Sequence, residues 1–276
     1  RGGEGVQVKS HFPEHIEREY RRLLTRRIVS LAKKIVPMIR QSYKVNHIVD
    51  SAGHKVKVDA SFDEALARIL EQMRGDVQPS EYVKNTLAKT FNDVGEWTTK
   101  ETVNVFKKKR GVSKLSIDLA VAQVESLRES DIVSNYAEGF MRTNLELVEL
   151  AGNEYIEGIY TVAKDGYLNG LSLRQMTDQM KEFTDGNISK AKFWATDQIG
   201  DAWASYNKAA QKSAGVEKYR WRTMGDNAVR DLHKDLDGKV FTWETGAPGL
   251  EKPGAKHPGE SYRCRCFPEP IFPGEE

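Results

Sequence analysis

The residues best suited to chemistry lie near the C-terminal end of the 276-residue chain. Both cysteines, Cys264 and Cys266, and two of the six histidines, His233 and His257, fall within this segment. Thiolate and imidazole are the ligands that zinc prefers, and four of them complete a tetrahedral site. Side chains at i and i+2 of an extended segment point to the same side, so both sulfurs could face one ion. The pattern predicts that the four residues share one site, with zinc as the candidate metal.

A second interpretation of the same residues needs no metal. The C-x-C spacing is tighter than the usual spacing of structural zinc ligands, and the histidines are far apart in sequence. Buried cysteines also act as small apolar side chains, while the histidines would bond to loop backbone. Residues 245–262 contain many Gly and Pro residues and few apolar ones, so this loop needs a specific contact that holds it in place. A metal or a buried polar network would each provide one, and both alternatives stay open.

Polar residues around His233 allow two further interpretations. If 226–236 is a helix, Asp226, Arg230 and His233 lie on one face, and Asp237 follows. Histidine with carboxylate suits general acid–base catalysis or metal-dependent hydrolysis. The same residues suit a structural network in which Arg230 pairs with Asp226. Because neither a nucleophile nor a dense carboxylate cluster accompanies them, the sequence favours the network over an enzyme.

Basic residues gather near the start of the chain, where five arginines occur within ten residues on a segment with helical periodicity. Such a face would suit the phosphates of a nucleic-acid backbone, docking on an acidic protein, or simple solvation. No aromatic residues alternate with the arginines, so sequence-specific recognition is not expected. The arginines are Arg18, Arg21, Arg22, Arg26 and Arg27.

Apolar residues at helical spacing predict long helices through the first three quarters of the chain. A helix is expected over 12–43, with Pro37 kinking or ending it, and a hairpin or loop over 45–60. Further helices are predicted from capping boxes at Ser61 and Ser172, from Pro79, from Asp131 to Gly166 or Gly170, and from a Ser189 cap to Gly215.

The last quarter predicts a different architecture, with short strands at 218–221 and 239–243, a helix at 226–236 and an extended tail at 267–271. The expected fold is mainly α, with a long-helix N-terminal region followed by a small α+β C-terminal domain with a loop-rich end. The expected divisions are a flexible tail at 1–11, a helical region at 12–164 and the C-terminal domain at 165–276.

Composition narrows the class of protein. Hydrophobic residues make up 39% and charged residues 30% of the chain. This hydrophobic content is too high for an intrinsically disordered chain. A net charge of +2 does not by itself indicate binding to nucleic acid or to a membrane surface. No run of about 18 apolar residues predicts a membrane span, and no secretory leader is visible, so synthesis is expected in a reducing cytoplasm.

The C-terminal motifs resemble those of the phage Mu protein F-like family, the minor head or head morphogenesis proteins of tailed bacteriophages. The resemblance covers about 165–270. Upstream, Gly170-Leu171-Ser172 and Gly215 fit the pattern, and Thr196 stands where the family usually has arginine. The motifs are Asp226-x3-Arg230-x2-His233-x2-Leu236-Asp237-Gly238-Lys239-x-Phe241, His257-Pro258-Gly259 and Cys264-Arg265-Cys266.

The resemblance implies a low-copy virion protein inside the head near the portal vertex, made in the host cytoplasm, that assists head assembly and genome packaging or ejection. Implied partners are the portal protein and a major capsid or scaffolding protein, with nonspecific contact with packaged DNA and no membrane. The resemblance implies no catalytic activity. The alternative is a metal-dependent hydrolase or nuclease that uses His233, His257 and Asp226.

Overall fold

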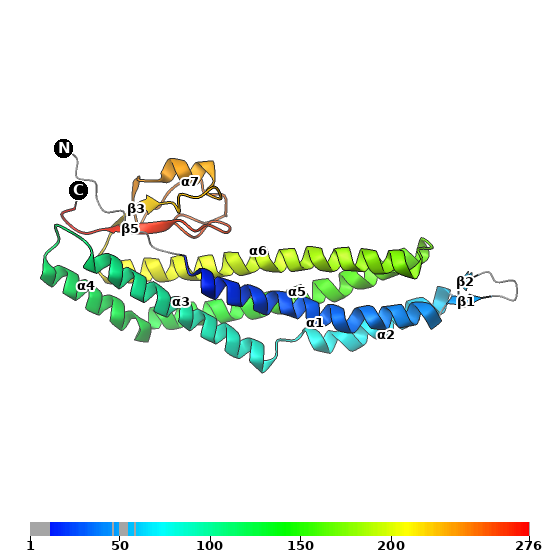
Figure 1. Ribbon diagram of the computed structural model, residues 1–276. Coiled ribbons are helices and arrows are strands. Elements are labelled where there is room, and N and C mark those ends of the chain that lie inside the picture. The colour runs from blue at the N-terminus through cyan, green and yellow to red at the C-terminus, as the bar shows by residue number, and fades with distance from the viewer. Residues whose placement is uncertain (1–11, 46, 50–54, 58, 276) are drawn as a thin grey trace. The chain divides into compact units, whose positions relative to one another are not determined.

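The computed structural model describes residues 12–45, 47–49, 55–57 and 59–275, so the predicted tail at 1–11 lies outside the described residues. Most of the described chain is helical, with a three-stranded antiparallel sheet near its C-terminal end (Figure 1). No helix in the described part of the chain combines the length and the apolar character needed to cross a bilayer. The helices are α1 (Glu14–Val45), α2 (Asp59–Arg74), α3 (Glu81–Lys107), α4 (Lys114–Ser126), α5 (Asp131–Leu168), α6 (Leu173–Ser213) and α7 (Asp231–Leu236), with 3-10 turns η1 (Gly75–Val77) and η2 (Leu127–Glu129).

The chain forms two compact units, each assembled from separate segments. The helical unit contains residues 20–85 and 143–194, and the sheet unit contains the remaining described residues. The long helices α1, α5 and α6 contribute residues to both units. The predicted boundary between 164 and 165 falls inside α5, and it stays a prediction because compactness does not measure independent folding.

The helical unit has a core built on the predicted apolar stripe of α1. Side chains spaced three or four residues apart along α1 are buried, as the periodicity predicts: Tyr20, Leu24, Ile28, Leu31, Ile35, Ile39 and Tyr43. Phe62 of α2 stacks on Tyr167 of α5 with ring centroids 4.1 Å apart. Helical periodicity therefore identified this core correctly.

Of the two outcomes expected at Pro37, an end of the first helix is wrong, because α1 continues to Val45, and a kink stays a prediction. A proline inside a helix removes one backbone hydrogen bond. Ile35 and Ile39, on either side of it, are each only 1% exposed. Their burial holds the segment in helical conformation through the proline.

Two other sequence-based helix boundaries were wrong. Helix α2 begins at Asp59, so Ser61 lies inside it rather than at its cap. Ser189 is also inside a helix, α6, where its hydroxyl donates to the Asp185 carbonyl at 3.0 Å. The capping box at Ser172 is confirmed, since its backbone N–H donates to Gln175 Oε1 at 2.9 Å and its Oγ accepts from the Gln175 N–H at 3.3 Å. The hairpin is also confirmed, as strands β1 (His47–Val49) and β2 (Lys55–Lys57).

Close packing of α5 on α6 leads to a first prediction. A Cβ placed on Gly158 would overlap the Phe183 ring. Gly158→Ala should therefore lower the free energy of unfolding by about 1–3 kcal/mol, as overpacking usually does. Gly186→Ala is the matched control, since a Cβ placed there would meet nothing within 4 Å, and alanine should stabilise the helix by about 0.5–1 kcal/mol. Urea denaturation of both variants checks this, and equal effects would contradict it.

The sheet unit carries strands β3 (Lys218–Arg222), β4 (Val240–Thr242) and β5 (Phe267–Ile271) in the order β4-β3-β5. Tyr219 and Trp221 alternate toward a buried cluster that also contains Leu236, Trp243 and both cysteines. Strand β5 contains two prolines, which an edge strand tolerates because its outer side needs no donor. All three predicted extended segments are confirmed, but the predicted helix over 226–236 begins only at Asp231.

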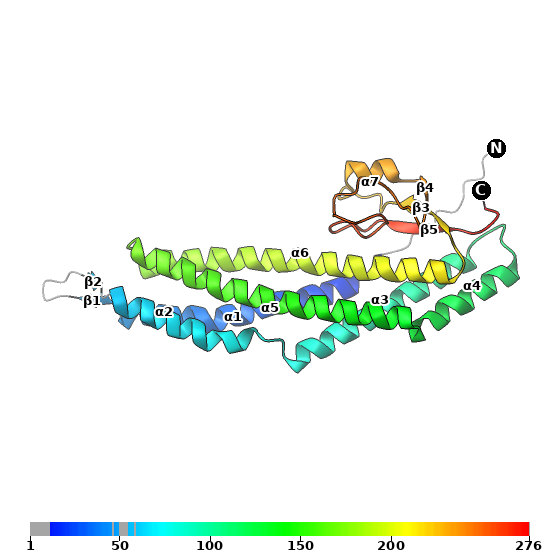
Figure 2. The ribbon, with the colours of Figure 1, turned by 180° about the vertical axis from the view of Figure 1, so that it is seen from behind.

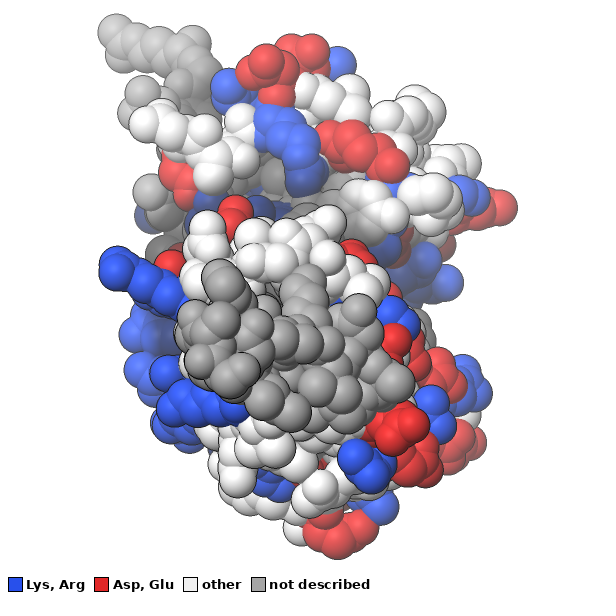
Figure 3. Space-filling model, turned by 90° about the vertical axis from the view of Figure 1, so that its right-hand side faces the viewer, with Lys and Arg blue, Asp and Glu red and all other residues white. Residues whose placement is uncertain are grey.

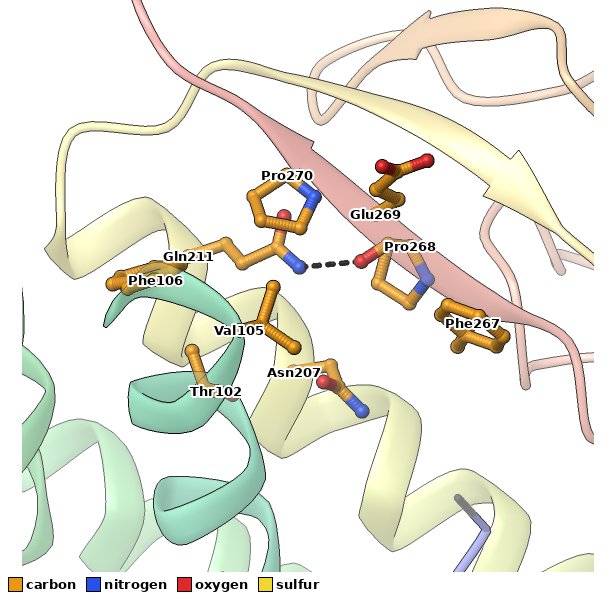
Figure 4. A pocket seen from close by; sticks show the side chains of 9 residues that line it. All are labelled: Thr102, Val105, Phe106, Asn207, Gln211, Phe267, Pro268, Glu269 and Pro270. Atoms are coloured by element: carbon orange, nitrogen blue, oxygen red, sulfur yellow. Dashed lines mark hydrogen bonds between the residues drawn. The ribbon is translucent and has the colours of Figure 1, made fainter. Parts of the chain in front are cut away.

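Strand β5 is fixed against α3 and α6 in the same unit (Figure 4). The side-chain amide of Gln211 donates to the Pro268 carbonyl at 2.7 Å. Phe106 of α3 packs edge-on to Phe272 with ring centroids 5.0 Å apart. These contacts hold β5 against α3 and α6. Because β5 directly follows Cys266, they also fix the position of the two cysteines relative to these helices.

Candidate metal centre

Three of the four predicted ligands converge in the sheet unit. The Nδ1 atom of His233 lies 3.4 Å from Sγ of Cys264 and 3.4 Å from Sγ of Cys266. The three ligand atoms all lie within 4.8 Å of one another. The three residues are only 2%, 4% and 3% exposed. A buried group of one imidazole and two thiols, both unbridged, could hold a metal ion.

Local structure places each member of this group. His233 lies on α7, three residues before Leu236, so both side chains face the buried cluster. Cys264 and Cys266 lie two apart just before β5 and point to the same side, as their spacing predicts. Arg263 has a φ of 53°, which is rare for a side-chain-bearing residue. This left-handed residue turns the chain immediately before Cys264.

A hydrogen-bonded outer layer fixes the orientation of His233. Its Nε2 lies 3.1 Å from Oε2 of Glu251, which leaves Nδ1 directed at the two sulfurs. Arg230 lies 3.6 Å from the other carboxylate oxygen of Glu251 and also donates to the Tyr262 carbonyl. Metal-ligating histidines commonly bond through their second nitrogen to a carboxylate. The arrangement around His233 has this form.

The three pKa shifts of the group do not all act in the same direction on metal binding. Hydrogen bonding from Cys266 holds the pKa of Cys264 well below its usual range, despite burial and with further help from His233. The same interaction, together with burial, raises the pKa of Cys266. Burial acts to lower the pKa of His233, but Cys264 and Glu251 outweigh it and the pKa is raised. The lowered pKa favours the thiolate at Cys264, the form that binds metals, whereas Cys266 and His233 would each have to release a proton to bind one.

The spacing of the ligand atoms fits a tetrahedral zinc site. Zinc bonds of about 2.3 Å to sulfur and about 2.0–2.1 Å to nitrogen place these atoms roughly 3.6 Å apart at a tetrahedral angle. The two observed nitrogen–sulfur separations are each 3.4 Å, and the two sulfurs lie within 4.8 Å of each other. A cavity of about 20 Å³ borders the group, which is room for about one water molecule. Three protein ligands and one water would complete four-fold coordination.

The fourth predicted ligand, His257, is not a member of this group of ligand atoms. Its Nδ1 lies 2.9 Å from the Tyr219 hydroxyl, and its ring is 5.0 Å from that of Trp243. The backbone N–H of His257 donates to the Glu260 carboxylate at 3.0 Å. His257 therefore fastens the long loop to the sheet through the Tyr219 side chain, and not through loop backbone as the non-metal interpretation expected.

Burial of His257 leads to a second prediction. Burial lowers its pKa to about 4, so only the unfolded chain binds this proton between that value and 6.5. Stability should therefore fall as pH falls through this window, by roughly 3 kcal/mol. Burial raises the pKa of Asp201 to about 6, which acts in the opposite direction. The measurable quantity is therefore the stability difference between wild type and His257→Gln, which should shrink by that amount from pH 7 to pH 4; a constant difference would contradict it.

The three residues of the predicted polar network each have a partner, but they do not pair with one another. Asp226 pairs with Arg265 at 2.6 Å, and Arg230 pairs with Glu251 rather than with Asp226. Asp237 accepts the Thr223 N–H at 2.7 Å. The Asp226 side chain accepts the Ala228 N–H at 3.1 Å, a local bond that favours a turn over a helix. This explains why the predicted helical face of Asp226, Arg230 and His233 does not form.

Sequence reasoning missed a second polar group that ties the loop to α6. Lys252 lies 3.1 Å from Asp197 and 2.6 Å from Asp201. Asp197 also accepts the backbone N–H of Arg263 at 3.1 Å. The only signal in the sequence was two aspartates four residues apart on a predicted helix. Thr196, which replaces the usual arginine, donates to the buried Glu17 carboxylate at 2.6 Å.

The arginines of α1 differ in their surroundings. Arg18, Arg22 and Arg26 are exposed, whereas Arg21 is half-buried. Arg27 is also half-buried and donates to the carbonyl of Gln78 at 2.9 Å. Figure 3 shows basic side chains gathered on the left flank of that view and acidic ones mainly on the right. Contact with a polyanion or partner stays a prediction, and the three exposed arginines are its best candidates.

Comparison with known proteins assigns the segment that holds the site. Residues 157–268 match the family described as phage Mu protein F like protein. An uncharacterized protein of Haemophilus influenzae (strain KW20 / Rd) is 22% identical over 213 residues, which are 77% of this chain and 44% of that protein. The chain therefore spans less than half the length of this relative. No solved structure gives a significant match.

Proposed function

We propose that this chain, whose residues 157–268 form a phage Mu protein F-like domain, is a minor head protein of a tailed bacteriophage. The family implies a role in head morphogenesis. The finer proposal is that the protein is present at low copy inside the head, binds the portal protein, and assists genome packaging or ejection. The observation that carries it is the match, because the matched segment contains every residue of the candidate metal centre and its outer layer.

The architecture supports a structural role. The long loop at 245–262 is fastened at three places: by the group of His233, Cys264 and Cys266 with Glu251, by Lys252 on α6, and by His257 on the sheet. Such fastening gives a rigid small domain on long helices. We propose that zinc occupies the group in the virion and that its role is structural.

A catalytic alternative has one observation in its favour, the small cavity beside the three ligands, which resembles the open position of a catalytic zinc site. The surrounding carboxylates do not fit that role. Asp226 is paired with Arg265, and Glu251 is held by His233 and Arg230. General acid–base catalysis beside such a zinc would need a side chain free to exchange protons with the bound water. We therefore favour structure over catalysis.

Composition of purified heads tests the proposed function. Heads produced with and without the gene should be compared by quantitative mass spectrometry against the major capsid protein. We expect the chain to co-purify with heads at a small fraction of the capsid copy number and to crosslink to the portal protein. Absence of the chain from both mature heads and assembly intermediates would contradict a virion role.

Charge reversal separates the two proposed roles of the exposed arginines. Arg18→Glu, Arg22→Glu and Arg26→Glu together should abolish incorporation into heads if the face docks on an acidic protein. Normal incorporation with defective packaging or ejection would instead indicate contact with DNA. Reversal of the exposed Lys107, Lys108 and Arg110 is the matched control for charge alone. Normal incorporation and infectivity of the α1 variant would leave an ordinary solvated face.

A further inference from the structure

Helix α4 presents apolar side chains to solvent as well as to the core. Leu115 and Leu119 are 70% and 59% exposed, while Ala120 and Val124 on the other side are 3% and 0% exposed. Within the sheet unit, α4 lies beside α3 (Figures 1 and 2). The outward residues follow helical spacing and are called here the outer stripe of α4: Leu115, Leu119, Ala122 and Ser126.

The charges beside the outer stripe have the wrong sign for an isolated helix. The first turn of α4 contains Lys114 and no acidic residue, and the last turn contains Glu125 and no basic residue. Each such charge opposes the helix dipole and costs about 0.3–1 kcal/mol. Neither side chain forms an ion pair with any residue that the structure describes. A partner that placed opposite charges beside these two would remove this cost.

Lys114 and Glu125 also share one flank of the stripe, on which the exposed Asp118 lies between them. Glu125 lies eleven positions after Lys114. Eleven positions make almost three whole turns of an α-helix, so the two side chains point to the same side. When two copies of a helix pack antiparallel about a twofold axis, the same flank of each copy meets, in reverse order. Lys114 of one copy then lies beside Glu125 of the other, and this pair occurs twice.

We propose that the outer stripe of α4 binds the same stripe of a second copy of this chain, with the two helices antiparallel. Leu119 meets its own equivalent near the twofold axis, and Leu115 packs between Ala122 and Ser126 of the second copy. Each lysine also lies near the negative end of the other helix. The charges that are unfavourable in one copy thus become favourable in the pair, as expected of a self-complementary interface.

The size of this contact sets its strength. A helix of 13 residues is about 20 Å long, so a pair buries less than the roughly 1,200–2,000 Å² of a stable interface. We therefore expect a weak, reversible dimer with a Kd on the order of 100 μM, in line with a contact at the low end of interface sizes. Copies held near one another in a larger assembly would pair through it more completely.

Sedimentation equilibrium of the full chain from about 10 to 500 μM tests the proposal, because this range brackets the Kd expected of so small an interface. Wild type should show a monomer–dimer equilibrium. Leu119→Glu places two like charges at the axis and should weaken the dimer at least tenfold. Lys114→Glu and Glu125→Lys should each weaken it several-fold. The double variant Lys114→Glu with Glu125→Lys should restore the wild-type Kd to within about twofold, since it exchanges both partners of each pair.

Folding is controlled separately. All variants should melt within a few degrees of wild type at low protein concentration, and the exposed Lys239→Glu should leave the dimer unchanged. A chain that stays monomeric at 500 μM, a dimer that Leu119→Glu leaves intact, or a double variant no tighter than the single ones would each overturn the proposal. Binding of the stripe by an unlike protein would give the first of these outcomes.

Discussion

Chelation of the zinc-loaded protein is expected to lower its melting temperature by about 10 °C. Zinc at a thousand times its Kd would contribute about 4 kcal/mol, and each kcal/mol shifts the melting temperature of a protein of this size by about 2–4 °C. The geometry supports this expectation because Cys264, Cys266 and His233 already have the spacing of zinc ligands. Calorimetry with and without chelator, together with metal analysis, measures the effect.

Variants of the ligands should separate metal binding from hydrogen bonding. Cys264→Ser and Cys266→Ser should each abolish bound zinc and the response to chelator. Glu251→Gln should keep the fold but weaken zinc binding about 10–100-fold, as loss of an outer partner usually does. His257→Gln is the matched control and should retain both zinc and the response, because its ring faces Tyr219 instead.

The competing interpretation predicts a different set of results. If the two cysteines only share hydrogen bonds with His233, the purified protein should contain no zinc even after growth with added metal. Chelator should then have no effect, and each Cys→Ser change should cost about 1 kcal/mol, the net worth of one hydrogen bond. That combination would contradict the zinc site while leaving the fold intact.

Local patterns made the long helices predictable from the sequence. The stripe from Tyr20 to Tyr43 follows a helical period, and Gly170 and Gly215 end their helices with left-handed φ values of 73° each. Helix α4 was not predicted, because exposed Leu115 and Leu119 and buried Ala120 and Val124 blur any single stripe. Apolar residues on both sides of α4 are also the observation on which the proposed contact with a second copy rests.

The site was predictable only where neighbours in sequence decide it. Two residues spaced i and i+2 on an extended segment must share a side, so the pairing of Cys264 with Cys266 followed directly. The position of His257 depends on Tyr219, 38 residues away, and no local pattern encodes such a contact. Glu251 was missed for a similar reason, since a single glutamate in a Gly/Pro-rich loop gives no signal of its partner.

Truncation at residue 164 is expected to abolish cooperative folding of the remaining helices. The predicted N-terminal region 12–164 keeps α1, α2, α3, α4 and most of α5 but lacks α6. Within the helical unit, α6 covers α5 closely: Tyr155 contacts Phe183 and bonds to Thr184 at 2.8 Å. Removing α6 would expose the buried face of α5, including Ile156 and Ile159. Helices that lose the partner of their apolar face are marginal in water.

Circular dichroism of two fragments tests this expectation. Fragment 12–164 should show helical signal that melts gradually over a broad range of temperature. Fragment 12–213 restores α6 while still lacking the sheet, and it should melt in one sharp transition because it contains every segment of the helical unit. A sharp two-state melt of fragment 12–164 would show that α6 is dispensable to this core. A gradual melt of both fragments would instead mean that the helical unit depends on the sheet unit, and the two measurements together therefore identify which segments fold as one.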